Sequence, residues 1–588
     1  MSARSRLWPA LLAGMGVALG LCGVHWGLPS RARLDRVMPP GSDTPELRQH
    51  LMESWSKMHA RYGVDIMLSP ESWFAGITGV QRVAPGWTRP PLILENPVRS
   101  FYIRSAHEDE QTFLIVLSRM RPWRLEMNPH IFIYGGAYIY SLGAWLALGA
   151  AARVASLHTS LAPYMADPSQ MASLYFVGRL FTVAIYVACA LLLLRIGRRH
   201  LGAESGIFAA LFFLLSPGVV VQAHVQKPHM LWTFFVLWTL DLSLGLLSSG
   251  GTAAYAAAGA VSGLAVGTFI EAWPACLVVG FACALRIWAL RKPAAAEAKG
   301  LAVAAASSLA AFFATNPYWI LDRATVRAEF GIISGGTAFH AAQPFFFLKE
   351  SFVSAVTWPV FVLIAAGAVR ALAKGRREPA LWLCLFAFVA GLAMMTTNGG
   401  GGITVRLVRY FLGFLAVGQL LAGRAAADLL RWKSPRRPWA LGALALVLAN
   451  LALAGVTYAY NFHRDAGDLS THVVSGAWIE AHVPPGSSIG LLRLPQPSNA
   501  PYFRYDRYDL RFIETPALFA ALPVAELPEY VATTSPDHDD RPFMEPNLSR
   551  YDLAAEFDRP WLVPWIAVHP TATTANPLID VYRLRRPR

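Results

Sequence analysis

The sequence predicts an α-helical polytopic membrane protein with about eleven transmembrane helices and a small C-terminal α/β domain outside the membrane. Its 588 residues are 55% hydrophobic and only 15% charged, with a mean hydropathy of +0.39, which is too apolar for an ordinary soluble protein. The apolar residues gather in long runs separated by short basic clusters, as expected of helices that cross ~30 Å of hydrocarbon.

The distribution of charge and of cysteines argues against a nucleic-acid-binding protein and against a fold held by disulfides or cysteine-bound metal. The formal net charge of +14 could suggest a nucleic-acid partner, but the basic residues stand in short clusters between apolar segments, which a bilayer explains better. We therefore expect no nucleic-acid binding. All five cysteines fall inside apolar segments without CxxC spacing, so they predict neither a disulfide framework nor a cysteine metal site.

Twelve apolar segments are long enough to be candidate spans. The first lies within residues 1–30, where 24 residues from Leu7 to Ser30 carry no acidic side chain, lysine or arginine. Such a run exceeds the core of a signal peptide and predicts an uncleaved first helix. The other candidates lie near 131–150, 175–194, 205–223, 230–249, 253–270, 272–290, 301–318, 352–369, 379–398, 405–423 and 438–460.

Basic clusters between these segments decide how many of them cross. They lie at 195–200, 291–293, 370–378 and 431–437. An even number of candidate spans separates each basic cluster from the next, so all four clusters lie on the same side of the membrane. If Arg4 and Arg6 are cytoplasmic, the positive-inside rule holds only when 131–150 stays in the interface, where its aromatic side chains suit the headgroup belt. The sequence thus predicts eleven spans.

This topology divides the chain into four parts. They are a first transmembrane helix (1–30), an extracytoplasmic loop with juxtamembrane helices and a charged motif (31–174), a multi-span domain (175–460) and a soluble extracytoplasmic domain (461–588). In the last part, short apolar runs alternate with Pro, Gly and Asp, which predicts a small α/β domain.

A charged cluster in the first loop, "SAHEDEQTFLIVLSRM" at 105–120, has two interpretations. It precedes an apolar, helix-like run. Acidic side chains in the first turn of a helix are stabilised by its dipole, so Glu108, Asp109 and Glu110 could form no more than a solvated helix start. Alternatively, they form a functional site at the lip of the membrane.

The residues that follow favour the functional interpretation. "HEDEQTFLIVLSRMRPWRLEMNPHIFIYGGAYIY" resembles the first-loop signature of bacterial membrane glycosyltransferases of the protein O-mannosyltransferase type, in which His-x-Asp-Glu precedes Asn-Pro-His-x-Phe-x-Tyr and a Tyr-rich juxtamembrane helix. Weaker similarities, such as "NPYWILD" and "RLVRYFLGFLAVG", extend over roughly 100–425. The matching residues of the signature are His107, Asp109, Glu110, Asn128, Pro129, His130, Phe132, Tyr134 and Tyr140.

The resemblance is to the protein O-mannosyltransferase and aminoarabinose transferase group (glycosyltransferase family 39). It implies the GT-C fold, a bacterial inner (cytoplasmic) membrane location and a polyprenyl-phosphate sugar donor. The chain departs from the family in two places. Relatives often carry an Asp just before the fourth span and Gly-x-Lys at the end of the fifth, where this sequence has His229 and, near the outer surface, Glu271. A second catalytic acid and a donor-phosphate lysine therefore cannot be carried over.

Transfer from a lipid-phosphate sugar needs a base for the acceptor and cations for the phosphate that is left behind. Asp109 is the candidate base, acting by in-line attack with inversion, and Glu110 and His107 complete the candidate catalytic set. A partly desolvated carboxylate has a raised pKa, so the sequence-based expectation is a raised pKa for Asp109.

The candidate phosphate ligands are Arg406, Arg409, Tyr410 and Lys227. The two arginines lie at the outer end of the tenth predicted span, where charged side chains are costly unless paired or solvated. The alternative is that both arginines only extend to the lipid headgroups.

Further candidates are His130, His224, His229 and Glu271. Imidazole and carboxylate suit zinc or manganese, so a divalent metal is conceivable near His224 and His229. Their spacing of five is not a recognised ligand pattern, and no cofactor or metal ligand is assigned.

Two other functional classes stay open. A polytopic transporter would place ionisable groups deep within its spans and often has two related halves, whereas Asp241 is the only acid well inside a span and no matching halves are visible. A non-catalytic membrane scaffold would share the same topology. The expected partners are the lipid bilayer, a polyprenyl-phosphate sugar and a glycan, lipid or protein acceptor.

Overall fold

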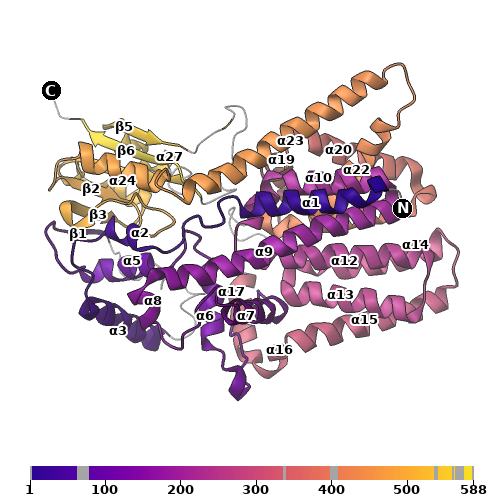
Figure 1. The fold of residues 1–588 in the computed structure, drawn as a ribbon, viewed down its shortest axis with the longest axis horizontal. Helices are drawn as coiled ribbons and strands as arrows, with labels where there is room; N and C mark the ends of the chain where they lie inside the picture. The colour runs from indigo at the N-terminus through magenta and orange to yellow at the C-terminus, as the bar shows by residue number, and fades with distance from the viewer. Residues whose placement is uncertain are drawn as a thin grey trace.

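The computed structural model describes residues 3–62, 79–335, 339–396, 408–535, 541–558, 562 and 575–585. Figure 1 shows two parts side by side, a bundle of long helices and a smaller part that contains a β-sheet. The long helices of the bundle are α1 (Ala3–Leu21), α9 (Pro168–Ile196), α10 (Ala203–Leu215), α12 (His229–Ser248), α13 (Thr252–Thr268), α14 (Pro274–Trp288), α15 (Ala294–Thr315), α20 (Trp358–Lys374), α21 (Pro379–Met394), α22 (Leu412–Leu430) and α23 (Arg437–Asp465).

Six helices in the described part of the chain are long and apolar enough to cross a membrane, or up to eight if each of two bent pairs forms one span. One bent pair is α10 with α11 (Pro217–Ala223), whose axes differ by 64°. Pro217 begins α11 and cannot continue the hydrogen-bond ladder of α10, which explains the bend. The other pair is Gln343–Val356 with α20, at 116°. The number of eleven spans stays a prediction.

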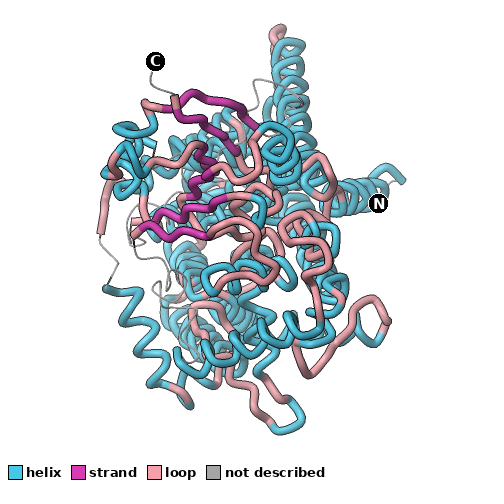
Figure 2. The backbone as a smooth tube through the Cα atoms, turned by 90° about the vertical axis from the view of Figure 1, so that its left-hand side faces the viewer, coloured by secondary structure: helices cyan, strands magenta, loops and turns pink. Residues whose placement is uncertain are grey.

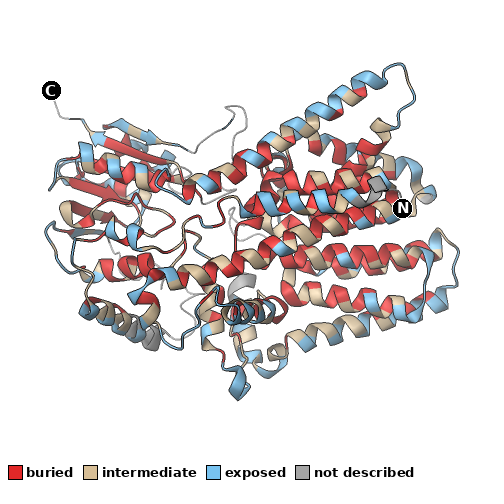
Figure 3. Cartoon of the chain, in the orientation of Figure 1, coloured by how far each residue is buried: buried red, intermediate tan, exposed pale blue. Residues whose placement is uncertain are grey.

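The outer faces of the bundle are apolar. Figure 3 shows buried residues on the inside of the bundle and exposed residues along α15 and α23. Exposed side chains on the bundle include Leu309, Val369 and Leu446, of which Leu446 is 73% exposed. A surface of this kind is the one expected where helices meet lipid.

The basic clusters at 195–200, 370–378 and 431–437 lie at one end of the bundle. Arg431 pairs with Glu204, just after the first cluster. Arg424 donates to the carbonyl oxygen of Leu201 at 2.8 Å and lies 3.7 Å from Glu378. These contacts join three of the four clusters, and Figure 1 shows the N-terminus at the same end.

Segment 131–150 does not run along the bundle. Its helix α7 (Gly136–Ala151) is seen end-on in Figure 1, where the bundle helices run across the view, and it packs against α9 and α13. It lies near the sheet end of the bundle, opposite the basic clusters.

The sheet has six strands in the order β1-β3-β2-β4-β6-β5 and lies to one side of the molecule (Figure 2). β2 pairs in parallel with β3 and β4, whereas the other pairings are antiparallel. The strands are β1 (Val80–Val83), β2 (Ser488–Leu491), β3 (Asp509–Ile513), β4 (Tyr530–Thr534), β5 (Tyr551–Phe557) and β6 (Ile579–Leu584), and the accompanying helices are α24 (Thr471–His482), α25 (Pro516–Ala521) and α27 (Arg541–Leu548).

The sheet extends beyond the predicted C-terminal domain, because β1 belongs to the first loop. It pairs with β3 and covers an edge that would otherwise expose unpaired backbone groups. The predicted boundary at 461 therefore separates two parts of one sheet. The sequence did not predict β1, because four residues without a clear alternation of polarity are too short a pattern.

Short helices of the chain pack around the bundle and the sheet domain. A hydrophobic core unites residues of the first loop, α9 and the sheet domain, such as Phe101, Tyr175 and Tyr505. The helices are α2 (Arg31–Asp35), α3 (Pro45–Tyr62), α5 (Leu92–Ile103), α6 (Glu110–Arg119), α8 (Ala162–Ala166), α16 (Tyr318–Leu321), α17 (Arg323–Gly335), α18 (Gln343–Phe347) and α19 (Val353–Val356).

Candidate active site

Asp109 lies at the end of the bundle nearest the sheet, where three distant segments meet. It immediately precedes α6, yet its side chain does not cap that helix. Its Oδ2 instead accepts hydrogen bonds from Nζ of Lys227 and, at 3.1 Å, from Nη1 of Arg409, residues 118 and 300 positions away. Lys227 stands in the turn between α11 and α12, and Arg409 in the 3-10 turn before α22. The interpretation of Asp109 as part of a solvated helix start therefore does not agree with the structure.

The two cations reverse the expected pKa shift of Asp109. Desolvation by burial would raise the pKa of this carboxyl, but the charges of Lys227 and Arg409 outweigh it and hold the pKa well below its usual range. The sequence-based expectation of a raised pKa was therefore wrong, because it considered burial without the partners. Burial, helped by the charge of Arg409, lowers the pKa of Lys227 to about 8.

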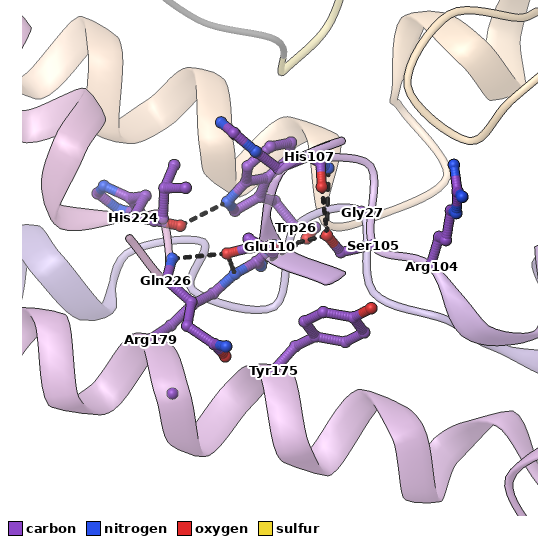
Figure 4. A network of polar contacts seen from close by, with 12 residues as sticks. Trp26, Gly27, Arg104, Ser105, His107, Glu110, Tyr175, Arg179, His224 and Gln226 are labelled. Carbon is purple, nitrogen blue, oxygen red and sulfur yellow. Dashed lines mark hydrogen bonds and ion pairs between the residues drawn. The ribbon is translucent and has the colours of Figure 1, made fainter. Parts of the chain in front are cut away.

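Glu110 belongs to a separate, fully buried ion pair with Arg179 of α9 (Figure 4). Its Oε1 accepts from Nε of Arg179 at 2.9 Å and from the backbone N–H of Gln226 at 2.7 Å. Its Oε2 accepts from Nη2 of Arg179 at 2.7 Å and from Oγ of Ser105 at 2.6 Å. Four donors fill the four acceptor positions of a carboxylate. We therefore assign Glu110 to structure, contrary to its expected place in the catalytic set.

Arg179 extends this ion pair to the first helix. Its Nη1 donates to the carbonyl oxygens of Val24 and Trp26, at 2.8 and 2.7 Å, and its guanidinium lies 4.7 Å from the Trp26 ring centroid. The pair thus joins the segment that follows α1 to α6 and α9. An arginine inside an apolar segment is costly unless paired, and this signal in the sequence would have singled out Arg179.

His107 supports the backbone of Asp109. Its Nδ1 accepts the N–H of Asp109 at 3.2 Å, and its ring meets the Trp26 ring edge-on. Burial lowers the pKa of His107 to about 4, so the imidazole is neutral at pH 7. A neutral Nδ1 that accepts a hydrogen bond positions Asp109 and is not free to take a proton from a substrate.

Three aromatic rings stand beside the cations. Phe269 stacks between Tyr134 and Tyr410, with centroid distances of 5.7 and 5.9 Å. Nζ of Lys227 lies 5.8 Å from the Tyr134 ring, and the guanidinium of Arg409 lies 5.2 Å from the Tyr410 ring. The acid, the two cations and the three rings therefore form one continuous cluster. Phe269 was not a candidate, since nothing in its local sequence distinguishes it from a core residue.

The segment that carries Tyr134 is held by the "NPYWILD" segment and α17. Asp322 accepts from Nδ2 of Asn128 at 2.7 Å and lies 3.4 Å from Nδ1 of His130. Glu329 accepts from two successive backbone N–H groups before Tyr134, at 2.8 and 3.0 Å. His130 thus takes part in holding this segment, and its ion pair is with Asp322 and not with Asp109.

The remaining histidine candidates occupy different environments. The two ring nitrogens of His224 face the carbonyl oxygens of Val220 and Cys22, at 2.7 and 2.8 Å, and so tie α1 to α11. His229 is fully buried against the aromatic rings. Within the described ranges, no group of three or more His, Cys, Asp or Glu side chains is arranged to hold a metal ion.

Two candidates remain to be placed. Glu271 lies in the turn that directly follows Phe269. Arg406 lies outside the described residues, as does the whole stretch "NGGGGITVR" at 398–406.

The sheet domain reaches the charged motif through a contact that the sequence does not signal. Oγ of Ser498 donates to Oε1 of Glu108 at 2.9 Å. Glu108 is therefore bound to the C-terminal domain, and Glu110, on the other side of Asp109, is bound to Arg179 of the bundle.

No family model and no curated protein sequence matches the chain. Similar solved structures include ArnT from Cupriavidus metallidurans bound to undecaprenyl phosphate, at 14% identity over 89% of this chain and 98% of that one, with a TM-score of 0.40. The oligosaccharyltransferase of Archaeoglobus fulgidus matches at 13% identity over 88% and 74%, with a TM-score of 0.44. The arabinofuranosyltransferase AftD from Mycobacteria matches at 17% identity over 92% and 40%, with a TM-score of 0.36.

All three are GT-C glycosyltransferases. Their identities and TM-scores are low, so the case for function comes from the side chains around Asp109.

Proposed function

We propose that the protein is a membrane glycosyltransferase that moves a sugar from a polyprenyl-phosphate donor to an acceptor on the exported side of a bacterial inner membrane. The observation that carries this proposal is the sharing of Asp109 by Lys227 and Arg409. Two cations and one carboxylate leave one positive charge in excess at the end of an apolar bundle. A lipid-linked phosphate has the charge and the apolar tail that such a place would bind.

In the proposed reaction, Asp109 accepts the proton of an acceptor hydroxyl or amine as that group attacks the anomeric carbon. The bond from this carbon to the phosphate oxygen breaks, and the polyprenyl phosphate leaves with its charge matched by Lys227 and Arg409. In-line attack inverts the anomeric configuration. Arrival of the donor phosphate would also draw the two cations from Asp109, which restores the basicity that their charges suppress.

The position of the cluster supports the exported side. Asp109 immediately precedes α6, which Figure 1 shows away from the end of the bundle that carries the N-terminus and the basic clusters, and the positive-inside rule puts those clusters in the cytoplasm. The sheet domain would then also be extracytoplasmic. A mannosyltransferase-like donor belongs to this hypothesis.

A transporter is less consistent with the side chains found. Asp241, the acid inside a predicted span, pairs with Arg195 at 3.2 Å and His200 at 3.3 Å, near the basic clusters. Arg195 and His200 can thus balance the charge of Asp241, which needs no role in carrying a substrate through the bundle.

The proposal predicts that the purified full-length chain in proteoliposomes consumes a polyprenyl-phosphate sugar. We expect radiolabel from at least one donor of a panel of polyprenyl-phosphate sugars to leave the donor and appear in an acceptor fraction, with release of polyprenyl phosphate. Sugar nucleotides, the matched control, should transfer no label because they lack the lipid. If no donor of the panel is consumed, and cells without the protein keep all exported glycans unchanged, the proposal is wrong.

A further inference from the structure

His229 occupies the middle of the cluster and has no assigned role. It is the first residue of α12, two positions after Lys227, and its side chain is 1% exposed. Its ring meets those of Tyr134, Phe269 and Tyr410 nearly at right angles, with centroid distances of 6.4, 5.5 and 5.8 Å.

Neither ring nitrogen of His229 has a hydrogen-bond partner among the described residues. A buried polar group without a partner costs about 1–3 kcal/mol, and most native structures avoid it. His224, five residues earlier, is different, because its ring N–H can donate to the carbonyl oxygen of Val220 or of Cys22. A ligand that supplies the missing partner would account for the difference between the two histidines.

The charges around His229 indicate the chemistry of that ligand. Lys227 and Arg409 both donate to the same oxygen of Asp109 and retain further N–H groups. An anion with several acceptor oxygens could bind these groups and an imidazole N–H together.

We infer that His229 completes the phosphate site, and that its imidazole N–H donates to an oxygen of the polyprenyl phosphate. This inference rests on the proposed function and assigns one further residue to its binding site. A histidine N–H can donate to a phosphate oxygen.

Titration of the full-length chain in nanodiscs with undecaprenyl phosphate, which carries no sugar, tests the inference. His229→Phe keeps a ring but removes the donor, and the affinity should fall about 10-fold, the loss expected for one hydrogen bond to a charged group. His229→Gln retains an N–H donor and should stay within about threefold of the unmodified protein. Polyprenol, which lacks the phosphate, should bind all of these proteins equally weakly.

Trp232→Phe is the matched control. Trp232 lies one helical turn further along α12, is fully buried, and also has a ring N–H without a partner, but it packs against Phe269 and Phe414 instead of the cations. Its substitution should leave the affinity for undecaprenyl phosphate unchanged, and thermal unfolding checks that each variant is folded.

The outcomes separate this inference from the proposed function. Equal binding by His229→Phe and the unmodified protein would refute the role of His229 alone, as would equal losses in His229→Phe and Trp232→Phe, which would indicate packing. If His229→Phe loses affinity only for a donor that carries a sugar, His229 contacts the sugar and not the phosphate, and the inference is also overturned. No binding of undecaprenyl phosphate by the unmodified protein would count against the proposed function itself.

Discussion

Asp109→Asn is expected to lower the rate of sugar transfer by about 10²-fold or more, with little change in folding. Asparagine keeps the shape of the side chain and an oxygen that can accept from Lys227 or Arg409, but it cannot take the acceptor's proton. The side chain is 40% exposed, so the substitution leaves no buried cavity. Because the two cations lose their negative partner, the affinity for undecaprenyl phosphate should stay equal or rise. Transfer rate and lipid affinity, measured on one preparation, show this separation.

Glu108→Gln is the matched control for this prediction. Glu108 is the neighbour of Asp109, and its carboxylate accepts only from Ser498 among the contacts described above. Glutamine retains an acceptor oxygen for that hydrogen bond, so transfer should remain within a few-fold. Full complementation of a deletion strain by Asp109→Asn at normal protein level would end the assignment of Asp109 as the base.

The second large effect is expected on stability. Glu110→Gln should lower the free energy of unfolding by about 3–5 kcal/mol, because it leaves Arg179 buried without a countercharge. Both side chains of this pair are 0% exposed. Protein yield and thermal unfolding in detergent measure the effect. Replacing both partners by apolar residues, Glu110→Leu with Arg179→Met, should recover part of the loss.

A different result would change the role of Glu110. If Glu110→Gln folds with unchanged stability but has lost transfer, Glu110 is part of the chemistry and Asp109 is not the only acid involved. The sequence alone makes Glu110→Gln the natural control for Asp109, since the two acids are adjacent. The ion pair with Arg179 makes it unsuitable, because an unstable variant also loses activity.

The sequence predicts well the features that depend on local patterns. Long apolar runs locate the bundle helices, in some cases to within a few residues, such as 230–249 for His229–Ser248, whereas the helix expected at 405–423 is Leu412–Leu430. Asp109, Arg409 and Tyr410 each stand in a motif or at the edge of an apolar run, which made them candidates, and their roles stay predictions. Length and composition alone do not reveal the bends at Pro217 and before Trp358.

Features that depend on distant partners could not be predicted in this way. The pKa of Asp109 falls instead of rising because Lys227, 118 positions away, and Arg409 reach the same oxygen. The strand β1 acquires its structure only by pairing with β3, from the other end of the chain. In each case the local sequence gives the residue type, and the tertiary contact gives its role.

The central claim is that the cluster of Lys227, Arg409 and Asp109 binds a polyprenyl phosphate. The most direct test is the affinity of the full-length chain for undecaprenyl phosphate, compared between the unmodified protein and Lys227→Met. Methionine has nearly the same length and suits a site that leaves the lysine side chain 1% exposed, so the fold should persist. Loss of one charge-assisted hydrogen bond should weaken binding by about 10- to 100-fold. Equal affinity of the two proteins would contradict the claim and leave Lys227 as a structural partner of Asp109.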